Sequence, residues 1–130
     1  MKTKEELLVI NFDKGNIKRV KKLIEQGADV NYTRSNIWDG TPLLIEAINR
    51  VDIDMVKLLV ENGADLNKTC HWNNIIPIEV ANKDIEHYYW YNPNPMQEIY
   101  DYLLNAEIIQ RTIKINRLLS NIKHQTVQQS

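Results

Sequence analysis

Apolar residues recur along the chain at helical spacing, most clearly within residues 56–67. Val56, Leu59 and Val60 follow an i, i+3, i+4 pattern, which places them along one face of a helix. Gly63 comes directly after this stripe, and glycine is the residue that most readily ends a helix in the left-handed conformation. The pattern therefore predicts a helix with one buried face that stops at Gly63.

The same pattern occurs 36 residues earlier in the chain. Residues 20–31 read VKKLIEQGADVN and residues 56–67 read VKLLVENGADLN, and eight of these twelve positions are identical. Repetition at a period of this length is typical of proteins built from stacked structural units. The sequence therefore predicts at least two copies of one local fold.

A second, shorter helical pattern precedes each copy. In the first unit, Thr3 and Glu6 have the spacing of a capping box ahead of an apolar run. In the second unit, Thr41 is expected to cap a helix that has Pro42 at its first position. Each unit is thus predicted as a helix, a tight turn, a second helix and an extended loop. Because a helix pair this short cannot bury its own apolar face, neighbouring units must stack.

Three motifs accompany these helices. They are Gly40-Thr41-Pro42-Leu43 at the start of the second unit, Gly-Ala-Asp at residues 27–29 and 63–65, and the asparagines Asn31 and Asn67. Together they resemble the ankyrin-repeat family. The resemblance implies an all-α solenoid of about three helix-turn-helix units with extended finger loops, forming a single domain over residues 1–130. The expected units cover about residues 3–36, 37–71 and 72–106.

The third unit departs from this pattern. Pro77 echoes the first helix of the earlier units, and Ile99 and Leu103 echo the second. An insert near residues 85–95, with the sequence IEHYYWYNPNP, separates the two helices. Ala106 replaces the glycine that ends the second helix in the earlier units. Without that stop, the last helix is able to run on toward the end of the chain.

The C-terminal part continues with apolar residues at helical spacing. Because a solenoid needs a polar outer surface on its last unit, we predict a C-terminal capping helix over about residues 107–122. The polar residues 123–130 are expected to form a frayed tail. After Glu107 the chain has four basic and no acidic residues, so this segment has a net charge of +4. The residues up to and including Glu107 have a net charge of −5. We interpret this charge as the ordinary preference of helix C-termini for cations, and a basic surface for an acidic partner is the alternative.

Composition narrows the class of protein. With 130 residues, 43% of them apolar and 25% charged, the chain fits one ordinary globular domain. No apolar run approaches the roughly 20 residues of a membrane-spanning helix, so a membrane protein is not expected. Cys70 is the only cysteine, which excludes an intramolecular disulfide and fits a reducing, cytoplasmic location.

The sequence offers no motif for catalysis. It has no GxGxxG, phosphate-binding loop, HExxH or CxxC pattern, so we predict no catalytic residue, cofactor, metal or small-molecule substrate. Asp84, Glu86 and His87 lie within four residues, but a helix would not place all three on one face. A cryptic enzyme built on these three residues is the alternative, and their substitution would then abolish an activity.

Aromatic residues gather in loops and in the insert. Trp38 and Trp72 occupy equivalent loops, and the resemblance implies that such finger loops and the face of the first helices bind partners. Tryptophan and tyrosine are also enriched at interface hot spots. The predicted partner-binding residues are Tyr32, Arg34, Trp38, Asp39, His71, Trp72, Tyr88, Tyr89, Trp90 and Tyr91. Two alternatives stay open: the tryptophans pack finger against finger, or the insert folds back as a lid.

These observations predict a protein–protein interaction module that is not an enzyme and is monomeric on its own. As a stand-alone module, it is expected to act as an inhibitor or adaptor that occludes a partner protein. Small free-standing ankyrin proteins in bacteria resemble immunity factors that block a toxin, which makes a toxin or enzyme the expected partner. The alternative is a regulator that contacts nucleic acid, or a nucleic-acid-binding protein, through the basic C-terminal helix. Direct nucleic-acid binding is not expected, because that helix carries no aromatic residue.

Overall fold

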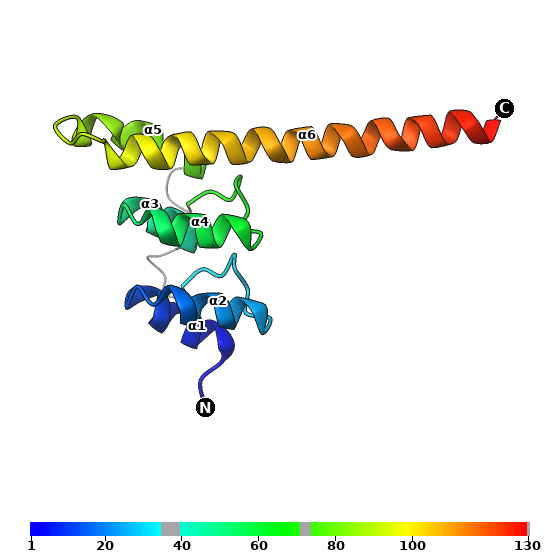
Figure 1. The fold of residues 1–130 in the computed structure, drawn as a ribbon. Helices are drawn as coiled ribbons and strands as arrows, with labels where there is room; N and C mark the ends of the chain where they lie inside the picture. The colour runs from blue at the N-terminus through cyan, green and yellow to red at the C-terminus, as the bar shows by residue number, and fades with distance from the viewer. Residues whose placement is uncertain (35–39, 71–73, 130) are drawn as a thin grey trace.

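The chain folds into three pairs of helices that stack in layers (Figure 1). This computed structural model describes residues 1–34, 40–70 and 74–129. The first layer is α1 (Lys4–Asp13) and α2 (Ile17–Glu25), and the second is α3 (Leu43–Asn49) and α4 (Ile53–Glu61). The third is α5 (Pro77–Asp84), the short 3-10 helix η1 (Ile85–Tyr88) and α6 (Pro95–Gln129). The expected all-α fold of paired helices is confirmed.

Polar side chains cap α1, α2 and α4 in the first two layers. The capping box of α1 is confirmed: the Glu6 amide donates to Thr3 Oγ1 and the Thr3 amide donates to Glu6 Oε2, each at 3.1 Å. Asn16 and Asp52 cap α2 and α4, and each side chain accepts a hydrogen bond from an amide in the first turn. The tight turns within the first two pairs therefore supply the caps of their second helices.

The start of α3 differs from the sequence prediction. Pro42, rather than Thr41, occupies the capping position, and no side chain caps this helix end. The Thr41 hydroxyl instead lies 3.2 Å from Cys70 Sγ, which belongs to the loop after the second layer. Thr41 thus connects two successive loops, a role that its position next to a helix start does not reveal.

The repeated glycines end their helices as predicted. Gly27 and Gly63 have φ angles of +102° and +93°, a conformation that residues with a side chain adopt at a cost. The amide after each glycine donates back to a carbonyl in the last helical turn, at 3.0 Å in α2 and 2.9 Å in α4. The second helix therefore ends with the same backbone conformation and hydrogen bond in both copies of the repeat.

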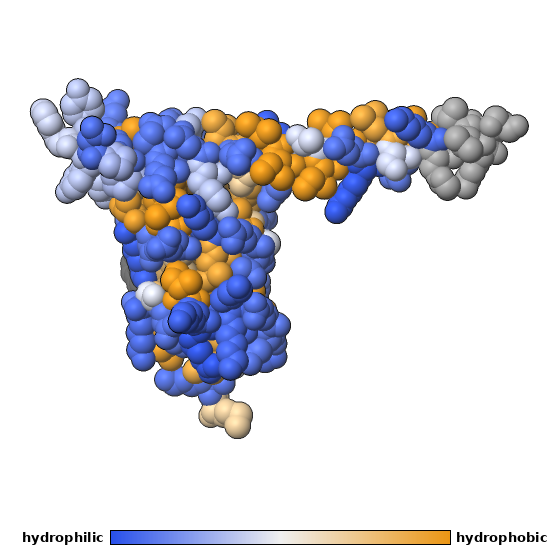
Figure 2. Space-filling view, viewed as in Figure 1, coloured by the Kyte–Doolittle hydropathy of each residue, from blue (hydrophilic) through white to orange (hydrophobic). Residues whose placement is uncertain are grey.

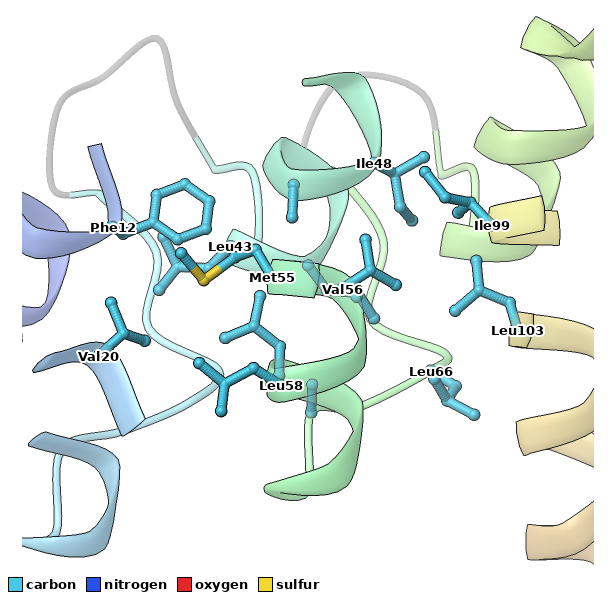
Figure 3. Packing of buried hydrophobic residues seen from close by; sticks show 14 of the residues in the cluster. Phe12, Val20, Leu43, Ile48, Met55, Val56, Leu58, Leu66, Ile99 and Leu103 are labelled. Carbon is cyan, nitrogen blue, oxygen red and sulfur yellow. The ribbon is translucent and has the colours of Figure 1, made fainter. Parts of the chain in front are cut away.

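Apolar side chains between the layers form one continuous core (Figure 3). Phe12 and Val20 project from the first layer toward the second, and Ile99 and Leu103 of α6 close the core from the other side. Leu59 of α4, in the middle layer, has no exposed surface. The apolar stripe that defined the repeat is therefore the surface that holds the layers together.

The C-terminal part differs from the expected separate cap over residues 107–122. One unbroken helix, α6, runs from Pro95 to Gln129, and every side chain from Ile108 to Lys123 is exposed. The physical reason lies at Ala106, because alanine favours helix where the earlier units have a helix-ending glycine. The helix consequently extends past the edge of the stack instead of covering it (Figure 1), and the expected tail is helical as far as Gln129.

Candidate functional site

The base of the first finger loop joins the first two layers. Tyr32 and Arg34, two of the predicted partner-binding residues, are half-buried there. Between them, Thr33 forms an isolated antiparallel bridge with Pro42 at the other side of the loop. The predicted contact residues Trp38 and Asp39 lie outside the described residues.

Arg34 is held in an ion-pair cluster that links the first two layers. Its guanidinium pairs with Asp13 at the end of α1, and its Nε donates to the two Glu46 carboxylate oxygens at 3.1 and 3.2 Å. Arg50 Nη2 donates to Asp13 Oδ1 at 2.8 Å, and its guanidinium lies 4.7 Å from the centre of the Phe12 ring. Glu46 of α3 therefore pairs with an arginine from the finger loop.

The same cluster lowers the pKa of Asp13 to about 2. The hydrogen bond from Arg34 is the largest cause, with Arg50 adding to it, while partial burial acts in the opposite direction. The Asp13 carboxylate in turn raises the pKa of Arg34. Because the folded-state pKa of Asp13 is below its ordinary value, its ionised form stabilises the fold above about pH 4. That stabilisation is lost as the pH falls through about 2.

We expect Asp13→Asn to destabilise the protein at pH 6, and by progressively less as the pH falls toward 2. The side chain of Asp13 is 42% exposed, so solvent screening limits the effect to about 1 kcal/mol or less. Urea unfolding of wild type and variant between pH 6 and 2 measures the difference, with Asp54→Asn as the control on an exposed aspartate outside the cluster. A difference that stays constant down to pH 2 would show that the charge of Asp13 is not the cause.

Hydrogen bonds that Asn31 accepts connect the loops of successive layers. Asn31 Oδ1 accepts from the Asp65 amide at 2.8 Å, and the Asn31 carbonyl accepts from Lys68 Nζ at 2.6 Å. In the first layer, Glu5 Oε1 accepts from the equivalent amide of Asp29 at 3.2 Å. The repeated asparagine was recognised in the sequence, but its partners are 34 and 37 residues away, so the connection is visible only in the fold. The next finger residues, His71 and Trp72, lie outside the described residues.

The insert between α5 and α6 presents aromatic side chains to solvent. Tyr89, Trp90 and Tyr91 are 74%, 90% and 62% exposed. Tyr88 differs from them, since it is partly buried and packs against the core. In the view of Figure 1, this loop projects beyond the layers of α1–α4. The insert is therefore attached to the third layer through Tyr88, and its three following aromatic residues form one exposed group.

The arrangement of the insert is fixed by contacts at both ends. Asn94 Nδ2 donates to the Ile85 carbonyl at 3.0 Å, and Asn94 Oδ1 accepts from the Met96 amide at 3.0 Å. Asn94 thus closes the loop and also caps the first turn of α6. The rings of Tyr89 and Trp90 meet edge to face, with 5.3 Å between their centres. We call Tyr89, Trp90 and Tyr91 the aromatic surface.

A shallow pocket lies between α3, α5 and the loop that carries Cys70. Its volume is about 170 Å³, which is below the roughly 300 Å³ at which small-molecule sites begin. Its walls come from two layers, so no local pattern in the sequence indicates this pocket. The lining residues are Thr41, Ile45, Asn49, Cys70, Ile75, Val80, Lys83 and Asp84.

The residues considered for catalysis do not form a site. Asp84 ends α5 and is half-buried, whereas Glu86 and His87 are exposed on η1. Within the described parts of the chain, no three His, Cys, Asp or Glu side chains lie close enough to hold a metal ion. Asp84, Glu86 and His87 are therefore not gathered on one helix face.

Stacked helix pairs joined by hydrogen-bonded loops define a helical repeat protein of the solenoid class. Residues 39–71, from the first finger loop to the second, match the family model described as ankyrin repeat. This part of the chain is therefore an ankyrin repeat. A search of curated proteins found no match. Ankyrin repeats are protein–protein interaction modules, and proteins of this family are generally non-catalytic.

Among the residues whose structure is described, no helix combines the length and the apolar character needed to cross a bilayer.

Proposed function

We propose that this chain is a non-catalytic inhibitor or adaptor that contacts a partner protein through its aromatic surface. The observation that carries the proposal is the exposure of Tyr89, Trp90 and Tyr91 side by side on one loop. Aromatic residues are enriched at the energetic centres of protein interfaces, and large exposed apolar groups commonly mark such interfaces. A polar loop of the same length would connect α5 and α6 equally well, so the connection itself does not require the three aromatic side chains.

The insert is also preorganised for binding. Tyr88 packs on the core, and Asn94 ties the far end of the loop to Ile85. A loop that is held in one conformation before binding loses less conformational entropy when it meets a partner. The aromatic surface can therefore contribute its full contact area to affinity.

The partner is proposed to be a cytoplasmic toxin or enzyme whose active surface the bound chain covers. The finger residues Tyr32, Trp38, Asp39, His71 and Trp72 are proposed to supply a second contact, as the family resemblance implies. Arg34 is assigned chiefly to the ion-pair cluster with Asp13 and Glu46, because those carboxylates already occupy its guanidinium. A module without reactive groups acts on its partner by occupying that partner's surface.

The test is reconstitution with a partner captured from native lysate on the immobilised chain. We expect one stoichiometric protein, and we expect its own activity to fall in proportion to the amount of chain added, until the two are equimolar. A captured partner whose activity is unchanged at saturation would support an adaptor and contradict an inhibitor. Capture of no stoichiometric protein would contradict both roles.

Salt dependence separates this proposal from the nucleic-acid alternative. Binding through aromatic contacts is expected to change little between 50 and 200 mM salt. Contacts of several basic residues with phosphates would instead weaken steeply over that range, by orders of magnitude. Strong, salt-sensitive retention of DNA or RNA by the purified chain would favour the basic helix as the functional surface.

A further inference from the structure

The part of α6 beyond the stack exposes many large apolar side chains. At its start, Met96, Ile99 and Leu103 are buried against the other helices, but from Ile108 to Lys123 every side chain is exposed. Figure 2 shows orange, hydrophobic atoms along this extension. The exposed residues are Leu104, Ile108, Ile109, Ile113, Ile115, Leu118, Leu119 and Ile122. A soluble helix with this composition normally packs against another protein surface.

Six positions of this extension follow a heptad pattern. Leu104, Ile108, Arg111, Ile115, Leu118 and Ile122 are separated by four and three residues in alternation. We call these six residues the seam. The three isoleucines occupy the a positions, and leucine occupies two of the three d positions. Isoleucine at a with leucine at d is the combination that favours two-stranded parallel coiled coils.

The seam lies to one side of the stack-facing surface of α6, about 100° around the helix from Leu103. It begins at Leu104, next to the buried Leu103, and consecutive helical residues are about 100° apart around the axis. Gln110 and Arg117 lie seven and fourteen residues after Leu103, so they continue the stack-facing side, and both are polar. A second helix can therefore lie along the seam without meeting the layers of its own chain.

We propose that the seam pairs with the same segment of a second copy of this chain, forming a parallel two-stranded coiled coil. The charged residues beside the seam are compatible with pairing to a second copy. In a parallel pair, Glu107 lies opposite Thr112 of the other copy, and Lys114 lies opposite Leu119, so neither meets a like charge. An antiparallel pair centred on the same seam would bring the two Lys114 side chains together.

Arg111 is the polar position in the seam. A charged residue at one core position lowers the stability of a coiled coil and fixes its register. Glu107 precedes Arg111 by four residues, which is the favourable order for an ion pair along a helix surface. The guanidinium can thus point to the flank, where its charge is balanced within each copy.

The surface area that the seam could bury between two copies is typical of a reversible dimer. Five half-exposed isoleucine and leucine side chains from each copy, with their neighbours, would bury on the order of 1,200 Å² in total, the lower end of the range for specific interfaces. We therefore expect a concentration-dependent dimer, in place of the monomer expected from the sequence. The proposal uses residues distinct from the aromatic surface, so it does not depend on the proposed function.

The decisive experiment is sedimentation equilibrium of the full chain, comparing Ile115→Lys with Ile113→Lys. These isoleucines are 55% and 46% exposed and two residues apart, but only Ile115 lies in the seam. Wild type and Ile113→Lys are expected to approach twice the monomer mass of 15.3 kDa as concentration rises, while Ile115→Lys stays at the monomer mass. Circular dichroism confirms that each variant is folded.

Two results would overturn the proposal. One is a wild type that stays monomeric at the highest soluble concentration, which would assign the seam to another occupant. The other is a dimer that Ile115→Lys leaves intact. Orientation is tested with Leu118→Cys in a Cys70→Ser background: a parallel pair should form a disulfide-linked dimer on mild oxidation, and Ile113→Cys should not. A dimer that fails to crosslink through position 118 would contradict the parallel arrangement.

Discussion

Replacing Leu59 by alanine is expected to lower the free energy of unfolding by about 2–5 kcal/mol. Leu59 has no exposed surface and belongs to α4 in the middle layer. Its truncation removes buried methyl groups and leaves a cavity that helices on both sides must close. The middle layer contacts both other layers, so the space cannot collapse without shifting them.

Equilibrium unfolding in urea measures the change, and Glu61→Ala serves as the control. Glu61 lies in the last turn of the same helix and is exposed, so its substitution is expected to change stability by less than about 0.5 kcal/mol. Equal stability of wild type and Leu59→Ala would show that the apolar stripe does not face the core as described.

The double substitution Tyr89→Ala/Trp90→Ala is expected to weaken partner binding by about 30-fold or more, the effect of removing an interface hot spot. Both side chains are largely exposed and contact each other, so their loss removes binding surface without opening the core. Thermal unfolding is accordingly expected to be unchanged. Isothermal titration of the captured partner into each variant measures the loss.

The matched control is Glu86→Ala/His87→Ala. These two residues are exposed, precede the aromatic surface in the same segment and lack its apolar area. We expect this variant to bind as wild type does. Equal weakening by both double substitutions would indicate a general disturbance of the loop, and no weakening by either would move the contact surface elsewhere.

The helices within the repeats were predictable because their signals are local. The apolar stripe, the left-handed glycines and the capping box of α1 each depend on a few neighbouring residues, and all three are confirmed. The cap expected at Thr41 was wrong, because its hydroxyl finds a partner, Cys70, that is 29 residues away. Local rules do not anticipate a competing contact at that distance.

The length of α6 shows a different limit of sequence analysis. The missing glycine at Ala106 was recognised, but the helical spacing that follows was interpreted as a cap for the stack. That interpretation rested on the need of a solenoid for a polar outer surface on its last unit. The same spacing contains the heptads of the seam, and only the exposure of residues 108–123 separates the two readings.

The candidate site was predictable in part. The aromatic cluster at residues 88–91 was evident from composition, and the structure adds that Tyr88 is an anchor while the next three residues are exposed. Arg34 was selected as a contact residue, but its partners Asp13 and Glu46 lie 21 and 12 residues away in the sequence. Their proximity depends on how the layers stack, which the local sequence does not specify.

The central claim is that a partner protein is bound through the aromatic surface of an ankyrin stack. Hydrogen–deuterium exchange of the chain, with and without its purified partner, tests this most directly. We expect slower exchange in the peptide that contains Tyr89, Trp90 and Tyr91 when the partner is bound. Unchanged exchange there, with protection confined to the finger loops or to residues 104–122, would contradict it.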